Sequence, residues 1–175
     1  VTAYSTTYSA FGAVGSMAVA ALSPMWSKVT QSAAEGNYRW VAKLLRTSLL
    51  AVIPFAMAFV LFAIFFKPIA KVWLGTELDY AAGLIPCMAL YYVLYLVGSV
   101  LSSISNGLGR TKVQLVTGFA GAAVNIPLSI FLCTVGKLDV TGVLVATVVA
   151  MFASNVAVFV DLARFLNQSS STDNG

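Results

Sequence analysis

Long apolar runs separated by short polar connectors dominate this chain. Five runs are long enough to cross about 30 Å of hydrocarbon at a helical rise of about 1.5 Å per residue. They cover residues 4–26, 44–66, 84–104, 113–135 and 141–165. None alternates apolar and polar residues over about ten positions, as a membrane β-barrel strand would. Because backbone groups in lipid must be satisfied within their own segment, we expect an all-α bundle of five transmembrane helices.

Composition narrows the class of protein further. Of the 175 residues, 59% are hydrophobic and only 9% are charged. Soluble domains carry about 25% charged residues, and disordered chains combine low hydrophobicity with high charge, so both classes are excluded. We expect a polytopic membrane protein with a transmembrane helical bundle at 1–166 and a cytoplasmic tail at 167–175.

Signatures of catalysis and metal binding are missing from the sequence. It contains no histidine, the commonest general base and metal ligand. No helix face carries paired carboxylates, and the Gly107-Leu108-Gly109 turn does not follow a strand, as a dinucleotide-binding loop must. We therefore expect no enzymatic activity, no catalytic residue, no metal and no cofactor.

Basic residues are distributed unevenly between the two ends of the expected helices. One end carries Lys28, Arg39, Lys43, Arg46, Arg110, Lys112 and Arg164, whereas the other carries Lys67, Lys71 and Lys137. The positive-inside rule makes the first end cytoplasmic, which places the N-terminus of this segment outside and its C-terminus inside. An outside N-terminus without a signal peptide suggests that further helices precede Val1. We attribute the net charge of +4 to this topology, and expect the lipid bilayer rather than nucleic acid as a partner.

Three of these cations form a stripe where the chain enters the second span. Arg39, Lys43 and Arg46 recur at steps of four and three, so a helix places them on one face. One interpretation is a topology anchor. The other is a phosphate contact at the cytoplasmic rim, for a lipid headgroup or for substrate.

Uncharged polar residues also follow single helix faces inside the spans, while no charged residue falls in the middle of a span. The missing charges count against a proton relay. The third span carries the row Tyr92, Tyr95, Ser99, Ser102 and Asn106, and the fourth carries the row Gln114, Gly118, Gly121, Asn125 and Ser129. A looser row in the fifth span includes Thr147, Met151 and Ser154, with Asn155 beside it.

Helix packing and a polar cavity both explain such rows. Small and hydroxyl-bearing residues suit helix interfaces in membranes, and we favour packing for the small-residue seam of the first span, formed by Ser5, Ser9, Gly12, Ser16, Ala20, Ser23 and Ser27. Tyr, Gln and Asn are larger than packing requires. We therefore expect a cavity for hydroxyl-rich or aromatic cargo, lined by Tyr92, Tyr95, Ser99, Ser102, Asn106, Gln114, Asn125, Ser129 and Asn155.

Proline adds a further alternative in the fourth span. Asn125 and Pro127 together resemble the interrupted helices that lie beside transporter binding sites. Proline is also common in ordinary membrane helices. Both interpretations remain open at this point.

An ordered set of short motifs suggests a family. The motifs are LSPMW at 22–26, EGNYRW at 35–40, VWLG at 72–75, NGLGRTK at 106–112, NIPLSI at 125–130 and GVLVAT at 142–147. In this order the chain resembles, from about residue 8 to residue 165, the C-terminal lobe of a bacterial O-antigen-type polysaccharide flippase. That family belongs to the multidrug/oligosaccharidyl-lipid/polysaccharide exporter superfamily.

The resemblance implies a two-lobe transporter of about twelve helices around a central cavity, of which this chain would supply five. It implies flipping of an undecaprenyl-diphosphate-linked oligosaccharide across the bacterial inner membrane by alternating access, without ATP hydrolysis. The implied partners are the lipid-linked oligosaccharide and the N-terminal lobe of the same protein. No coupling carboxylate can be assigned in mid-membrane. The alternatives are a cation-coupled multidrug exporter of the same superfamily and a non-transporting membrane scaffold.

Overall fold

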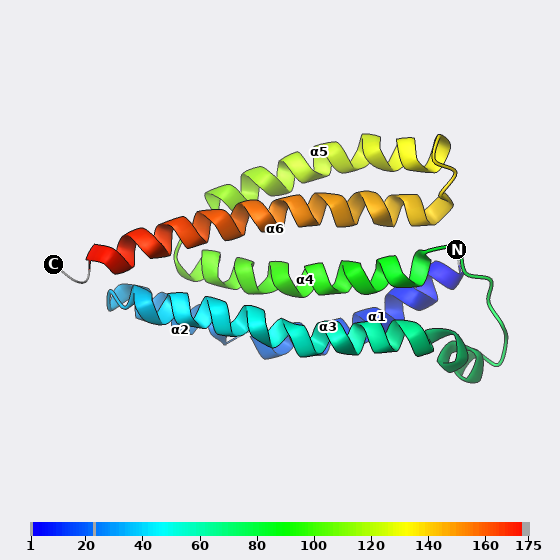
Figure 1. The fold of residues 1–175 in the computed structure, drawn as a ribbon, viewed down its shortest axis with the longest axis horizontal. Helices are drawn as coiled ribbons and strands as arrows, with labels where there is room; N and C mark the ends of the chain where they lie inside the picture. Colours follow the sequence, from blue (N-terminus) through cyan, green and yellow to red (C-terminus); the bar gives the residue numbers. More distant parts are fainter. Residues whose placement is uncertain (1, 23, 173–175) are drawn as a thin grey trace.

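The fold of the chain is entirely helical in the part that the structure, a computed structural model, describes, which is residues 2–22 and 24–172 (Figure 1). Its helices are α1 (Thr2–Leu22), α2 (Met25–Ala34), α3 (Tyr38–Leu74), α4 (Leu84–Gly107), α5 (Lys112–Thr134) and α6 (Asp139–Thr172). Five segments are long and apolar enough to cross a membrane, with α1 and α2 together forming the first. The all-α prediction with five candidate spans is confirmed.

The first expected span, 4–26, is divided by Pro24. Helix α1 ends at Leu22, and α2 begins at Met25 with Pro24 preceding it. A proline has no backbone N–H and clashes with the preceding turn, so it breaks a helix at this point. Helix α2 then buries Met25 and Val29 against the bundle.

Helix α3 has 37 residues and is about 55 Å long, far longer than its expected span of 44–66. The Asn37 side chain caps its start by accepting a hydrogen bond from the Trp40 backbone N–H (3.1 Å). Gly75 ends the helix in the left-handed region, with a φ of 69°. The last turns, which follow Pro68, bend away from the main axis of the helix (Figure 1).

Helix α4 lies at the centre of the bundle. It packs against α1, α2 and α3 on one side and against α6 on the other, and it contributes the largest share of buried residues (Figure 1). Helix α5 is outermost: it packs on α6, and none of its described residues is buried. The bundle is therefore two groups of helices that meet mainly at α4, with a smaller direct contact between α3 and α6.

An aromatic cluster holds α1 and α3 against α4. The Phe11 ring centroid lies 4.8 Å from that of Phe62 and 6.0 Å from that of Phe59. Tyr92 of α4 stacks on both Phe11 and Phe59, and its hydroxyl donates a hydrogen bond to the Tyr8 carbonyl oxygen (3.1 Å). Offset and edge-to-face ring pairs of this kind add to the stability that burial provides.

The two groups of basic residues lie at opposite ends of the bundle. The end that holds α2, the start of α3, the α4–α5 connector and the end of α6 carries the larger group (Figure 1). The predicted tail, 167–175, begins inside α6, which continues to Thr172; residues 173–175 lie outside the described residues, as does Ser23 of the small-residue seam.

Candidate functional site

A polar groove is formed by α1, α4, α5 and α6. Its volume is about 400 Å³, and its walls are made by Val19, Tyr95, Gly98, Ser99, Ser102, Ser103, Gln114 and Met151. Helix α4 supplies five of these residues, because steps of three and four return to the same helix face. Among the described residues that line the groove, none is charged.

Gln114 and Ser102 join the two polar rows across this groove. The Gln114 Nε2 group donates a hydrogen bond to the Ser102 Oγ atom (2.8 Å), which links α5 to α4. The Gln114 Oε1 atom is buried and has no hydrogen-bond partner among the described residues. A buried carbonyl oxygen without a donor is costly, so a hydrogen-bond donor that reached this atom would be stabilising, although the atom is enclosed in this arrangement of the helices.

The groove contains four of the nine expected cavity residues: Tyr95, Ser99, Ser102 and Gln114. Tyr95 is 39% exposed and lines the groove. Ser99 donates a hydrogen bond to the Tyr95 carbonyl oxygen (2.8 Å), which satisfies its proton and leaves its lone pairs as acceptors.

The other five expected residues lie elsewhere. Asn125 donates a hydrogen bond to the Thr147 hydroxyl (3.3 Å) and accepts one from Ser129 (2.9 Å), at the contact between α5 and α6. Asn155 donates to the Leu94 carbonyl oxygen (2.9 Å) between α6 and α4. These contacts are helix packing through polar groups, the alternative that the sequence left open.

Two residues of the polar row on α4, Tyr92 and Asn106, also lie outside the groove. Tyr92 is only 4% exposed because it fills the aromatic cluster, and Asn106 is exposed near the end of α4. Helix α5 runs without interruption through Pro127, so the Asn125 and Pro127 pair does not break it. Two residues that line the groove were not predicted from the sequence. They are Ser103, which follows Ser102, and Gly98, which lies about one helical turn before Ser102.

The expected phosphate stripe does not border the groove. Arg39, Lys43 and Arg46 are exposed on α3, a helix that contributes no residue to the walls of the groove. They lie at the basic end of the bundle (Figure 1). The stripe and the groove are therefore separate features of the surface.

An ion pair at the same end was not anticipated from the sequence. Arg110, in the α4–α5 connector, donates to both carboxylate oxygens of Asp161 on α6, at 3.2 Å from Nε and 2.8 Å from the terminal nitrogen. Its guanidinium carbon lies 4.5 Å from the Phe165 ring centroid. The hydrogen bonds to Asp161 raise the pKa of Arg110, against the opposing effect of burial. No local spacing signals a pair that is 51 residues apart in sequence.

Groups of acidic, cysteine and histidine side chains that could hold a metal do not occur among residues 2–22 and 24–172. Cys87 and Cys133 are free thiols, each partly exposed. The polar groove thus combines hydroxyl, amide and aromatic groups with the apolar side chains of Val19 and Met151, and the polar groups can bind a neutral polar ligand by hydrogen bonds.

Five helical segments of membrane-spanning length and composition define a multi-pass membrane protein. The family model MatE matches residues 1–131, about three quarters of the chain, and the chain belongs to this family. The family makes it a membrane transporter sequence of the multidrug/oligosaccharidyl-lipid/polysaccharide exporter superfamily, and not an enzyme. No curated protein and no solved structure matches the chain.

Proposed function

We propose that the protein translocates a lipid-linked oligosaccharide across the membrane by alternating access, for the assembly of a surface polysaccharide. The observation that carries this proposal is the uncharged polar groove, with Tyr95, Ser99, Ser102 and Gln114 among its walls. Serine hydroxyls donate and accept, and the amide of Gln114 does both through separate atoms. A sugar, with many hydroxyl groups, can donate to and accept from the polar groups that the contacts between helices leave free.

Cationic cargo fits the same groove less well. In the low dielectric of a membrane protein, an organic cation needs a nearby anion to offset its lost hydration. The described groove residues include no carboxylate. This favours the neutral, hydroxyl-rich part of a glycolipid over the cations that a multidrug exporter of the same superfamily moves.

The proposal includes a membrane orientation. The basic end would face the cytoplasm of a bacterial inner membrane, with the N-terminus of this segment outside and the C-terminus inside. Arg39, Lys43 and Arg46, exposed at that end, would attract the diphosphate before the sugar reaches the groove. The N-terminal lobe of the same protein would close the cavity from the other side.

The test is a substitution in the groove of the full-length protein, in cells that depend on it for surface polysaccharide. Gln114→Leu removes the unpartnered carbonyl oxygen and the bond to Ser102 while keeping similar volume. Losing one hydrogen bond to the cargo is expected to reduce the rate of polysaccharide appearance about fivefold. Quantitative staining of the surface polysaccharide after induction measures that rate.

Gln31→Leu is the matched control, because Gln31 is an exposed residue of α2 whose amide bonds to Glu35 and not to the groove. It should assemble polysaccharide at the rate of the unaltered protein, and both variants should reach the membrane in equal amounts. Normal assembly by Gln114→Leu at equal abundance would contradict the proposal.

A further inference from the structure

An apolar groove runs between α3 and α4 on the outside of the bundle. Its volume is about 580 Å³, and among the described residues that line it only Lys67 is polar. The apolar walls include Val60, Ala63 and Ile64 of α3 and Ala89, Leu90 and Val93 of α4. In a membrane-spanning bundle, an outward-facing groove of this composition is shaped for hydrocarbon rather than for water.

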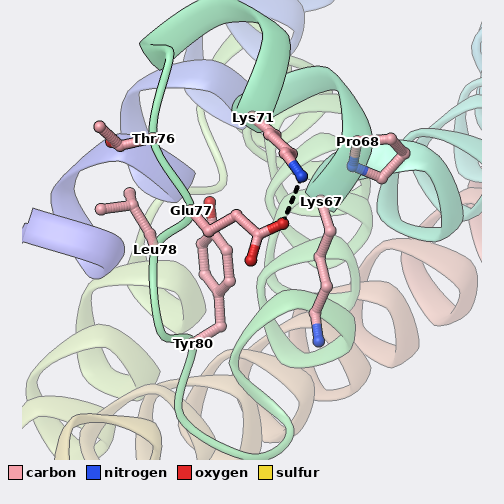
Figure 2. A pocket seen from close by; sticks show the side chains of 7 residues that line it. All are labelled: Lys67, Pro68, Lys71, Thr76, Glu77, Leu78 and Tyr80. Carbon is pink, nitrogen blue, oxygen red and sulfur yellow. Dashed lines mark hydrogen bonds and ion pairs between the residues drawn. The ribbon is translucent and has the colours of Figure 1, made fainter.

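Lys67 also lines a second, polar pocket at the end of this groove. That pocket has a volume of about 420 Å³ and includes Lys71, Glu77 and Tyr80 (Figure 2). Lys71 forms an ion pair with Glu77, and Figure 2 shows the Lys67 amino group lying away from this pair. Burial raises the pKa of the Tyr80 phenol, which keeps it a hydrogen-bond donor.

Lys67 has no carboxylate partner among the described residues. Lys71 pairs with Glu77, the acidic residue among those that line this pocket, so the charge of Lys67 remains available to an anion from outside the chain. A cation next to an otherwise apolar groove matches the two parts of an anionic lipid, which carries a phosphate at the end of hydrocarbon chains.

The position of Lys67 along α3 fits the depth of lipid headgroups. From Tyr38 to Lys67 the helix has 30 residues, about 45 Å in length, which is the thickness of a bilayer including its headgroups. Immediately afterwards Pro68 bends the helix. The following turn exposes Val72 and Trp73 by 86% and 64%, as a segment lying in the interface would.

We propose that the α3–α4 groove is a binding site for an anionic phospholipid of the surrounding leaflet. One acyl chain fills the groove along Val60, Ala63 and Val93, and the Lys67 ammonium binds the phosphate at the groove's end. This lipid site is separate from the polar groove, and the proposal does not depend on which cargo the transporter moves. Different experiments therefore test the two sites.

The experiment titrates the purified full-length protein in detergent with a phosphatidylglycerol or a phosphatidylcholine of identical acyl chains, and counts bound lipids by native mass spectrometry. The unaltered protein is expected to bind one phosphatidylglycerol more tightly than phosphatidylcholine. Lys67→Gln should weaken phosphatidylglycerol binding about fivefold, to the level of phosphatidylcholine. Lys137→Gln, which removes an exposed cation of the α5–α6 connector at the same end of the bundle, should leave that preference unchanged.

A second variant tests the hydrocarbon part of the site. Ala63→Phe places a ring in the groove and should abolish tight binding of both lipids, whereas Ala58→Phe, on an exposed part of α3 that does not line the groove, should not. Retention of the phosphatidylglycerol preference by Lys67→Gln would overturn the proposal, and so would unchanged binding by Ala63→Phe. Equal losses in Lys67→Gln and Lys137→Gln would also overturn it, since general surface charge would then account for the preference.

A photo-reactive amino acid at Ile64 identifies the occupant in the native membrane. Ile64 is 64% exposed and lines the groove, so it should crosslink to lipid. Crosslinks to another helix of the protein would show that protein covers the groove, and would overturn the proposal.

Discussion

At the scale of single residues, the bundle depends on a few long-range contacts between helices that are otherwise apolar. Arg110 and Asp161 tie the α4–α5 connector to α6 with two hydrogen bonds. Gly107 lies close to α2, where an added Cβ would be 2.6 Å from the Val29 Cβ atom and 3.0 Å from the Trp26 carbonyl oxygen. Each contact joins two helices or connectors that are far apart in the sequence.

The Arg110–Asp161 pair is expected to contribute modestly to stability. The two side chains are 38% and 20% exposed, so solvent screens the pair, although its two-pronged geometry is favourable. Asp161→Asn should lower the free energy of unfolding by about 1 kcal/mol, measured by thermal denaturation in one detergent. Asp79→Asn makes the same chemical change at an exposed loop residue and should have no effect; equal effects in the two variants would contradict the role of the pair.

The close approach of α2 to Gly107 predicts a larger loss of stability than removal of the Arg110–Asp161 pair. Gly107→Ala should destabilise the bundle by about 1–3 kcal/mol, because α2 must move to admit the methyl group. Gly118→Ala has open space around its Cβ position, and should be neutral or stabilising by up to about 1 kcal/mol because alanine favours the helix. Thermal denaturation of both variants in the same detergent provides the comparison, and a stable Gly107→Ala protein would contradict the packing between α4 and α2.

At the scale of elements, the polar rows have divided roles. Gln114 of α5 lines the groove. Two other polar residues of α5 instead contact α6. The Thr117 hydroxyl oxygen lies 3.0 Å from that of Ser154, and the Asn125 amide donates a hydrogen bond to the Thr147 hydroxyl. The opposite face of α5 exposes Phe119 by 77%, as a lipid-facing surface would. A single row of polar residues on one helix thus serves a groove at one end and helix packing along the rest.

Thiol accessibility separates these two roles. In a protein whose Cys87 and Cys133 are replaced by alanine, Ser102→Cys should react with a small water-soluble thiol reagent because Ser102 lines the groove. Ser154→Cys, packed against Thr117, should react much more slowly. Equal rates at the two positions, measured by the mass increase of the intact protein, would contradict the division of roles.

Sequence periodicity predicted the helices well because a membrane demands long apolar segments whose backbone groups are satisfied internally. It missed the extension of α3 to Leu74, since hydropathy marks the apolar stretch and not the ends of a helix. Three members of the α4 row and Gln114 of the α5 row line the groove. The rows could not say which helix each face meets, so Tyr92 and Asn125 were assigned to a cavity although they pack against α1 and α6.

At the scale of the whole molecule, the ends of the bundle differ in charge and the bundle carries two dissimilar grooves. The polar groove lies among α1, α4, α5 and α6, and the apolar groove lies between α3 and α4. A transporter of the MatE family needs a path for cargo and a surface for lipid. We assign the polar groove to the first role and the apolar groove to the second.

The charge difference between the ends makes a topology prediction. Glu35→Cys at the basic end and Leu138→Cys in the α5–α6 connector should react with a membrane-impermeant reagent from opposite sides, with Leu138→Cys labelled in intact spheroplasts. Glu35→Cys should be labelled only after the membrane is opened. Labelling of Glu35→Cys in sealed spheroplasts would contradict the proposed orientation.

The central claim is that the protein moves a lipid-linked oligosaccharide through the polar groove. The most direct measurement reconstitutes the full-length protein in liposomes and follows a fluorescent lipid-linked oligosaccharide from one leaflet to the other, alongside a cationic dye. We predict oligosaccharide translocation that Gln114→Leu slows about fivefold and Gln31→Leu leaves unchanged, with no protein-dependent movement of the dye. Dye transport without oligosaccharide translocation would contradict the account.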